Sequence, residues 1–502
     1  MNRVAIAFCL ILGVLMQALD TTIANVALPY MQGSLSASQD EIGWVLTSYI
    51  VAAAIMTAPA GFLANRFGVK PLYIVSVSGF TLASMLCGAA QTLGQIVVFR
   101  VMQGMFGAAL VPLAQSVLFS IMPRNRQGSG MALFGIAVMV GPVLGPVLGG
   151  WLTQNFSWRF VFYVNLPIGL VALIGTLIFL PKSDPKHNLK LDWIGFITLS
   201  IAIGALQMLL DRGQEKDWFS SREIIIEAVV AGVAFYLFLI QSFTARNPFV
   251  RPALFKNRNF AGGVVFIAVM GVTYFASMAL QPPYLQNLMG YPVLTSGLVM
   301  GPRGLGTMLA MLIVGRLIGI IDTRWLLVFG SALSGLSFYQ MMLWTPSVSE
   351  SAVIITGILQ GVGMGFIFVP LSTAALGTLE AEDRPDAASV YNLARNIGSS
   401  VGISVVNTLL TRSEQVVHDN IASAVTPFNR NLFETNVAHY WNPATKVGAA
   451  AINGVVNQQA QIISYSDDYK FLMIAILAAM PLVVMFDRAR PSAGAAPRVE
   501  LD

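Results

Sequence analysis

Long apolar stretches separated by short polar segments occupy most of this chain of 502 residues. A helix of about 17–25 mostly apolar residues is long enough to cross the hydrocarbon core of a bilayer. Fourteen stretches are long and apolar enough, with approximate limits at residues 4–28, 41–63, 71–90, 95–118, 128–152, 159–180, 193–211, 223–243, 260–281, 293–315, 325–344, 351–378, 386–411 and 470–487. The pattern predicts an all-α polytopic membrane protein.

The basic residues of the connections indicate how the chain is oriented. An even number of spans puts both ends of the chain on the same side of the membrane. The connections on that side hold most of the Lys and Arg residues, among them Arg66, Lys70, Lys182, Lys186, Lys190, Arg316 and Arg384. Because short cytoplasmic connections are enriched in Lys and Arg, we expect both termini in the cytoplasm.

One connection, residues 412–469, differs from the others. It is long, polar and rich in Asn and Gln, and it falls on the side opposite the termini. Residues 414–424 and 445–463 fit two helices, with a break that contains Pro427 and Pro443. Connections of this length are usually either functional or disordered. A disordered loop is the alternative, and we expect a folded segment that faces a partner.

The chain shows a weak internal echo that suggests two related halves. Gly61-Phe62-Leu63-Ala64-Asn65-Arg66-Phe67-Gly68 follows the second span, and Gly315-Arg316-Leu317-Ile318-Gly319 follows the tenth. We therefore expect a six-helix half over residues 1–190, two inserted helices over 191–245 and a second six-helix half over 246–502, which includes the loop 412–469. Transporters built from repeats commonly bind substrate at the repeat interface, near the middle of the membrane.

The composition excludes several classes of protein. The chain is 56% hydrophobic and 11% charged, whereas soluble domains carry about 25% charged residues. The net charge of +5 does not indicate nucleic-acid binding, because the basic residues lie in short connections. Cys9 and Cys87 lie in apolar runs and provide neither a disulfide framework nor zinc spacing. Without a phosphate-binding Gly-x-x-x-x-Gly-Lys loop or a nucleophile pattern, we expect neither ATP-driven transport nor an enzyme, and no metal site.

The first span carries Asp20, which by these limits is the one acidic residue well inside a span. Gln17, Asp20, Thr21 and Asn25 share one broad helical face. A carboxylate at this depth is energetically costly and is a functional-site hypothesis by default. Because desolvation favours its protonated form, we expect Asp20 to bind and release a proton. The alternative is a packing acid that is paired with a neighbour.

Arg100 and Gln103 lie in the fourth span. At 1.5 Å per residue, Asp20 lies about 12 Å and Arg100 about 8 Å from the outer helix ends. The two side chains are thus expected at similar depth, where a guanidinium favours the ionised carboxylate. The alternative is that Arg100 is an interfacial anchor whose head group reaches towards water.

Other polar residues within spans are candidates for lining a substrate path or a gate. Gln17 and Asn25 of the first span and Gln103 of the fourth are among them. The others are Arg303, Asn392 and Arg395, which are expected to face the bundle interior. A simple hydrogen bond between helices fits these residues equally well. Four residues in and after the ninth span are instead expected to pack in the core or against lipid: Phe266, Tyr274, Gln281 and Tyr284.

Four motifs follow one another along the chain. They are Leu19–Pro29 in the first span, the loop with Gly61, Arg66 and Gly68, Arg100-x-x-Gln103-Gly104, and the fifth-span run with Gly141-Pro142, Gly145-Pro146 and Gly149. Small residues four apart let membrane helices approach closely, and repeated Gly-Pro interrupts regular helix hydrogen bonding. Together these motifs resemble the major facilitator superfamily, and within it the fourteen-span drug:proton antiporter family. One departure is Asn65, where the family commonly has an acid, so the charge relay proposed for that acid is not carried over.

The resemblance implies two six-helix halves with two inserted helices, fourteen in all. It implies export of hydrophobic or amphiphilic toxic compounds across the bacterial inner membrane, with protons as the coupling ion and no other cofactor. The similarity is greatest to pumps of tripartite efflux systems, which implies a periplasmic membrane-fusion adaptor and an outer-membrane channel as partners, beside the lipid bilayer and hydrophobic small molecules.

Two other functions remain open at this point. One is a dedicated exporter of a single metabolite, such as a fatty acid or a siderophore. The other is a passive channel or facilitator, whose flux would not respond to the proton gradient.

Overall fold

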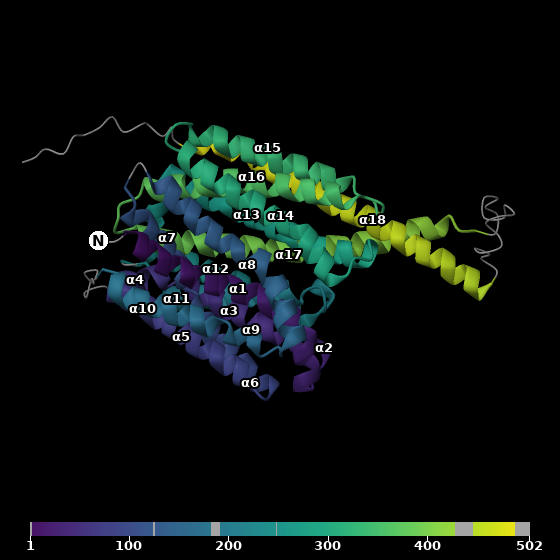
Figure 1. The fold of residues 1–502 in the computed structure, drawn as a ribbon, viewed down its shortest axis with the longest axis horizontal. Coiled ribbons are helices and arrows are strands. Elements are labelled where there is room, and N and C mark those ends of the chain that lie inside the picture. Colours follow the sequence, from purple (N-terminus) through teal and green to yellow (C-terminus); the bar gives the residue numbers. More distant parts are fainter. Residues whose placement is uncertain (1–2, 124–125, 182–190, 247, 427–444, 487–502) are drawn as a thin grey trace, which may run out of the picture.

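The computed structural model describes residues 3–123, 126–181, 191–246, 248–426 and 445–486, which form helices and no strands. Long helices run side by side along the longest axis of the molecule (Figure 1). The helix α1 (Arg3–Leu35) begins at one end of the bundle, which we call the terminal end. At the other end α17 (Arg384–Ser423) and α18 (Lys446–Ala478) project beyond the remaining helices, so we call it the extension end.

The elements between α1 and α17 follow the apolar stretches of the sequence. The first group comprises α2 (Gln39–Ile42), α3 (Trp44–Thr57), α4 (Ala60–Phe67), α5 (Val69–Ala89), α6 (Leu93–Gly107), α7 (Leu110–Ile121), α8 (Gln127–Asn155), α9 (Phe160–Tyr163) and α10 (Asn165–Phe179). Next come α11 (Trp193–Arg212), η2 (Trp218–Ser220) and α12 (Arg222–Thr244). The last group adds η3 (Pro252–Lys256), α13 (Arg258–Pro283), η4 (Tyr284–Leu288), α14 (Val293–Leu317), α15 (Thr323–Met342), α16 (Glu350–Gly377) and η6 (Met480–Met485).

The first and last groups of helices share one packing scheme. Helix α1 packs against α8 and α10, and α13 packs against α17 and α18 in the same way. Likewise α5 packs against α6 and α10, and α15 packs against α16 and α18. Helices α11 and α12 pack against each other beside the two groups. The arrangement is that of two related helical halves with an inserted pair.

The number of spans is the part of the fold that differs most from expectation. Among the described residues, 12 helical stretches are long and apolar enough to cross a membrane, and the pair α3 and α4, bent by 52° beside Pro59, makes a thirteenth. Helix α17 covers the expected span 386–411 and packs along α13. It is too polar over its length to meet the same criterion, so the count of fourteen stays a prediction.

The expected loop 412–469 is largely helical and continuous with its neighbours. Helix α17 continues to Ser423 without a break, and α18 runs from Lys446 straight into the last span. The helical prediction for residues 414–424 and 445–463 is therefore confirmed, but the expected helix limits at 411 and 470 were wrong. Small or apolar residues recur every four positions in the polar part of α18 and are buried: Gly448, Ile452, Val456, Ala460 and Ser464.

We call residues 412–426 and 445–463 the paired extension. Its helices are joined by Gln461, whose Nε2 donates to Glu414 Oε1 over 3.0 Å, and by His418 and Asn453, whose Nε2 and Oδ1 lie 3.1 Å apart. Some residues used in the sequence argument lie outside the described residues: Pro427, Pro443, Lys182, Lys186 and Lys190.

Candidate functional site

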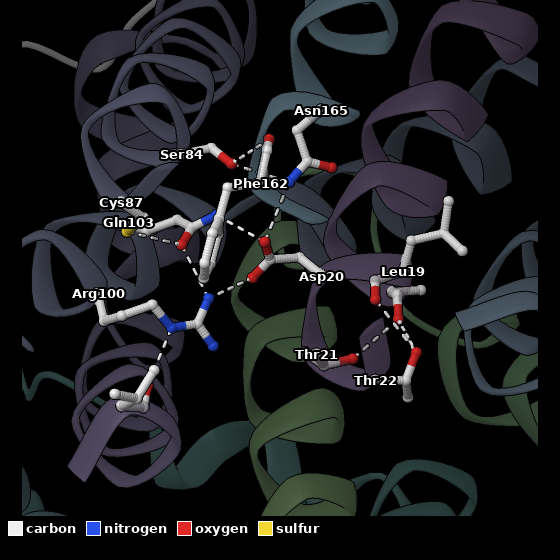
Figure 2. A network of polar contacts seen from close by, with 12 residues as sticks. Leu19, Asp20, Thr21, Thr22, Ser84, Cys87, Arg100, Gln103, Phe162 and Asn165 are labelled. Carbon is white, nitrogen blue, oxygen red and sulfur yellow. Dashed lines mark hydrogen bonds and ion pairs between the residues drawn. The ribbon is translucent and has the colours of Figure 1, made fainter. Parts of the chain in front are cut away.

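Asp20 lies at the centre of a buried polar network inside the first group of helices (Figure 2). Its side chain is fully buried. Oδ2 accepts a hydrogen bond from Arg100 Nη1 over 2.6 Å, and Oδ1 accepts from Gln103 Nε2 over 2.7 Å and from Asn165 Nδ2 over 3.0 Å. The carboxylate thus accepts three N–H donors, one of which belongs to a guanidinium.

Arg100 is fixed by contacts on several sides. Its helix α6 begins at Thr92, whose side chain caps the backbone N–H of Gln95. The guanidinium donates from Nη1 to Gln103 Oε1 over 2.8 Å and from Nε to Val45 O over 3.0 Å, and it lies 4.1 Å from the centre of the Tyr49 ring. The expected meeting with Asp20 is confirmed, and the anchor alternative is wrong, because the Arg100 side chain is only 1% exposed.

A second layer of residues orients this network. Asn165 Nδ2 also donates to Ser84 Oγ over 2.9 Å, and Ser84 Oγ donates to Phe162 O over 2.9 Å (Figure 2). Asn165 was not singled out from the sequence, because a single amide within a span does not by itself show which helix it faces. Gln17 lies near the Tyr49 hydroxyl, at the edge of the network.

A cavity of about 520 Å³ lies between α1 and α8 on one side and α13 and α14 on the other. Its wall is mainly apolar and consists of Thr22, Asn25, Val26, Pro29, Pro142, Val143, Pro146, Tyr274, Phe275, Met278, Ala279, Pro282, Gln286, Ser296, Gly297, Met300, Gly301, Arg303, Gly304 and Ile403. These residues come from the second half of α1, the end of α13 and the start of α14, so the cavity lies towards the extension end. An apolar wall with a few polar groups is typical of a small-molecule site.

The Gly-Pro run of α8 contributes both to the packing of α8 on α1, the helix that carries Asp20, and to the cavity wall. Its glycines face α1: a Cβ on Gly141 would overlap the carbonyl of Ala18, and one on Gly149 would lie 2.9 Å from Ile23 O. Gly145 is likewise packed against Thr22. The prolines of the same run, Pro142 and Pro146, line the cavity. The run therefore holds α8 tightly on α1 and shapes the cavity wall.

Helix α1 connects the carboxylate to the cavity. Asp20 points into the network, while Thr22, two residues further, lines the cavity and donates from Oγ1 to Gly141 O over 2.9 Å. Asn25 lies on the cavity wall as well. A displacement of α1 that follows a change at Asp20 would therefore change the cavity too.

Arg303 is a buried cation on the cavity wall, in the last group of helices. It is 3% exposed, donates to Gln281 Oε1 over 3.0 Å and to Ser277 Oγ over 2.9 Å, and lies 4.5 Å from the centre of the Tyr274 ring. No acidic residue in the described part of the chain forms an ion pair with it. Arg303 thus offers an uncompensated positive charge next to the cavity.

Tyr274 and Gln281 are buried as expected, at 5% and 3% exposed, and each also has a specific contact. Tyr274 lines the cavity and Gln281 holds Arg303. Their two companions in the same stretch, Phe266 and Tyr284, are buried in the core as expected, at 0% and 1% exposed.

The loop motif ties the two groups of helices at the terminal end. Gly61 lies so close to α17 that an added Cβ would be 2.5 Å from Asp386 Cα, and Asn65 Nδ2 donates to Asp386 Oδ1 over 3.2 Å. Gly68, between α4 and α5, has φ of 90°, a conformation that favours glycine. Arg66 lies in the last turn of α4.

Two further predicted residues lie on α17. Asn392 Nδ2 donates to Gln115 Oε1 of α7 over 2.5 Å, which is another contact between the two groups of helices. Arg395 is 7% exposed and donates to Asn396 Oδ1 over 3.3 Å, and it is not part of the cavity wall. The structure therefore brings Arg303 and Asn25 to the cavity but not Asn392 or Arg395.

Comparison with known proteins shows the family. Residues 10–403 match the model of the Major Facilitator Superfamily. The chain belongs to this superfamily. It is similar to the fatty acid resistance protein FarB of Neisseria gonorrhoeae, with 35% identity over 94% of each chain. It is also similar to the multidrug export protein EmrB of Escherichia coli K12, with 36% identity over 85% of this chain and 84% of that one.

A solved structure agrees on the fold. The human organic anion transporter MFSD10 matches 95% of this chain and 100% of its own with a TM-score of 0.59 and 12% identity. As a member of the major facilitator superfamily, the chain is a multi-pass membrane transporter rather than an enzyme.

One buried acid of this superfamily member was missed from the sequence. Asp468 lies in α18 and is 1% exposed, so it is a second acidic residue whose side chain is almost fully buried. The last span was expected to begin at residue 470, which left Asp468 in the loop. The row of buried residues every four positions, which ends in Ser464 and Asp468, was the signal that could have revealed it.

Proposed function

We propose that this transporter exports hydrophobic or amphiphilic toxic compounds in exchange for protons, with Asp20 as the proton-binding group and Arg100 as its regulator. The observation that carries the proposal is the buried Asp20–Arg100 pair, because Asp20 lies on α1, the helix that also contributes Thr22 and Asn25 to the cavity wall. The relatives named as multidrug export proteins support drug export. The proton coupling rests on the chemistry of Asp20.

The proposed cycle begins from the arrangement described above. If both termini are cytoplasmic, the terminal end is closed by contacts such as Asn65 with Asp386, and the cavity lies towards the outside. A proton from the outside then neutralises Asp20 and weakens its attraction for Arg100. Because α1 also forms the cavity wall, its movement couples proton uptake to the release of substrate and to the closing of the cavity.

The test is a panel of substrates in proteoliposomes that contain the purified protein, with and without an imposed pH gradient. Antiport predicts accumulation of substrate against its concentration only when the gradient is present, together with a matching proton flux. Equal fluxes with and without the gradient would identify a passive facilitator and overturn the proposal.

A second candidate is export of anionic amphiphiles such as fatty acids. It is favoured by Arg303, a buried cation on the cavity wall without an acidic partner among the described residues, and by the name of the gonococcal relative. A carboxylate head group would pair with Arg303 while its chain lies against the apolar wall. The panel separates the two candidates if it includes a fatty acid and a cationic dye of similar size.

We further propose that the protein works in the bacterial inner membrane with a periplasmic adaptor and an outer-membrane channel. The paired extension is the external surface on which an adaptor could dock. Val456 is buried between its helices, whereas Val416 and Ile463 are 60% and 40% exposed and remain available to a partner. The polar surroundings suit a wet interface.

Replacing residues 416–460 with a short Gly/Ser linker tests this role. We expect proton-driven transport in proteoliposomes to be preserved, and adaptor co-purification and drug resistance in cells to be lost. Normal adaptor binding and resistance would count against the docking role while leaving the antiport proposal intact.

A further inference from the structure

The carboxyl group of Asp468 has an unusual environment. Asp468 is 1% exposed, and its Oδ2 has no hydrogen-bond partner among the described residues. The adjacent Asp467 is exposed and therefore solvated. Neither the cavity nor the Asp20 network includes Asp468.

A cluster of aromatic rings includes the two tyrosines that flank this carboxyl on α18, Tyr465 and Tyr469. Tyr465 lies edge-on to Tyr284 of η4, with ring centres 5.2 Å apart. Trp344 lies 5.6 Å from Tyr284 and 5.9 Å from Tyr469 between ring centres. We call Tyr284, Trp344, Tyr465 and Tyr469 the aromatic cluster. Asp468 is buried on α18 one helical turn after Tyr465 and directly before Tyr469, so the carboxyl lies beside this cluster.

The charges around the cluster do not stabilise an ionised carboxylate. Asp467 on the same helix repels Asp468, and Glu414 of α17 adds negative charge near Tyr465. The cation that faces the cluster, Arg303 of α14, acts on Tyr469 and is held by Gln281 and Ser277. An ionised carboxylate with neither a cation nor a full set of donors is strongly disfavoured when buried.

We propose that Asp468 is a second proton-binding site, and that it carries a proton in the arrangement described here. To lose that proton, the carboxyl must reach water, which requires the aromatic cluster to open. The cluster includes Tyr284, which directly follows α13, whose Pro282 lines the cavity. Ionisation of Asp468 therefore moves the end of α13. Because this end forms the cavity wall opposite α1, the movement changes the shape of the cavity.

The site is tested on the purified protein in nanodiscs, without transport. Infrared difference spectra recorded on a pH jump report a buried carboxylic acid by its C=O stretching band. All samples carry Asp20→Asn, which removes the other proposed proton-binding carboxyl. This background and its combination with Asp467→Asn should both show the band, and its combination with Asp468→Asn should lack it. A band that is unchanged in Asp468→Asn would overturn the proposal.

A second variant covers the case in which Asp468→Asn does not fold. Asp468→Glu keeps the acid and should shift the frequency of the band, whereas an unshifted band would overturn the assignment. Trp344 gives an independent readout, because opening of the aromatic cluster should change its fluorescence with pH. This change should be absent in Trp344→Phe and in Asp468→Asn, and its persistence in Asp468→Asn would contradict the proposal.

The role of the site in transport rests on the proposed function and is tested separately. Substrate affinity in nanodiscs should change with pH in two steps, one lost in Asp20→Asn and the other in Asp468→Asn. If Asp468→Asn keeps both steps while Asp20→Asn loses one, the role of Asp468 in coupling is wrong and the antiport proposal stands. If the infrared band is lost in Asp468→Asn but Asp20→Asn still exports against the gradient, the second site stands and the antiport proposal through Asp20 fails.

Discussion

The two groups of helices each bury an arginine on an aromatic ring, and they neutralise it differently. Arg100 lies 4.1 Å from the Tyr49 ring and is paired with a carboxylate, Asp20. Arg303 lies 4.5 Å from the Tyr274 ring, but its partners in the described part of the chain are neutral. The same side chain is thus charge-compensated in one half and uncompensated in the other.

The position of the counter-charge is the structural difference on which the two proposed roles of these arginines depend. The counter-charge of Arg100 is the carboxylate of Asp20, which the binding of one proton would neutralise. This arrangement suits a switch. Arg303 has no carboxylate partner among the described residues, so its counter-charge would be an anionic ligand in the cavity. This arrangement suits the recognition of such a ligand. Burial alone would not have distinguished these roles, since both guanidiniums are almost fully buried.

Removal of Arg100 should have the largest effect. Arg100→Ala leaves a buried carboxylate without its cation, and such a change lowers the free energy of unfolding by about 3–5 kcal/mol. Because the protonated form of Asp20 is then favoured, the pH dependence of transport should move to higher pH. Thermal unfolding in detergent and pH profiles in proteoliposomes measure both effects.

Two controls make this prediction sharper. Arg303→Ala should lower the stability less, since no buried carboxylate loses its partner. The double variant Arg100→Ala/Asp20→Asn should recover part of the stability lost in Arg100→Ala. If the two single arginine variants unfold alike and the pH profile does not move, the contrast between the two arginines has no energetic basis.

The glycine run of α8 should have the next largest effect, because it positions the helix that carries Asp20. A Cβ on Gly141 would overlap α1, and overpacking of this kind costs about 1–3 kcal/mol. We expect Gly141→Ala to reduce stability and export. The matched control is Gly150→Ala on the same helix, where the added Cβ would meet only Val26 Cγ1, at 3.9 Å. Equal behaviour of both variants would show that the close approach of α8 to α1 is not required.

The ligand role of Arg303 should give a smaller and selective effect. Arg303→Gln removes the charge from the cavity wall, and we expect affinity for an anionic amphiphile to fall about tenfold, or about 1.4 kcal/mol. Affinity for an uncharged ligand of similar shape should be retained. Arg303→Lys is the control that keeps the charge. Isothermal titration with both ligands measures the difference, and an equal loss for both ligands would assign Arg303 a structural role.

The smallest effect is expected outside the membrane, at His418 in the paired extension. The pKa of His418 is raised, first by its hydrogen bond with Asn453 and then by that with Asp419. A raised pKa in the paired state means that pairing is favoured by protonation, so this contribution is present below about pH 6.5 and is lost as the pH rises through the raised pKa.

Spin labels on the exposed residues Gln415 and Asn457 measure this effect. The distance distribution should be narrower at acidic than at alkaline pH, and His418→Gln should remove the difference. A distribution that does not respond to pH in the wild type would mean that His418 does not contribute to the pairing.

Much of the N-terminal site followed from the sequence because local rules were sufficient. The rise per residue of a helix placed Asp20 and Arg100 at similar depth. The distance of 2.6 Å between Asp20 Oδ2 and Arg100 Nη1 confirms that the two side chains meet. The Gly-Pro run indicated close packing of α8, which the structure shows against α1. When few polar residues lie within the spans, a contact between two of them at the same depth can be predicted from the sequence.

The cavity and Asp468 did not follow, because each depends on contacts between distant segments. Tyr274 and Phe266 are aromatic residues of the same helix, and only tertiary packing decides that one lines the cavity and the other the core. Asp468 was misplaced because hydropathy alone made the last span begin at residue 470. Packing against other helices keeps α18 helical through the polar residues before that point.

The central claim is that Asp20 couples protons to export, and Asp20→Asn tests it most directly. The Asn side chain preserves the size and can still accept a hydrogen bond, but it cannot exchange a proton. In proteoliposomes we predict that Asp20→Asn retains substrate exchange at equal pH on both sides and loses accumulation driven by a pH gradient, together with the substrate-dependent proton flux. Undiminished gradient-driven accumulation by Asp20→Asn would contradict the account.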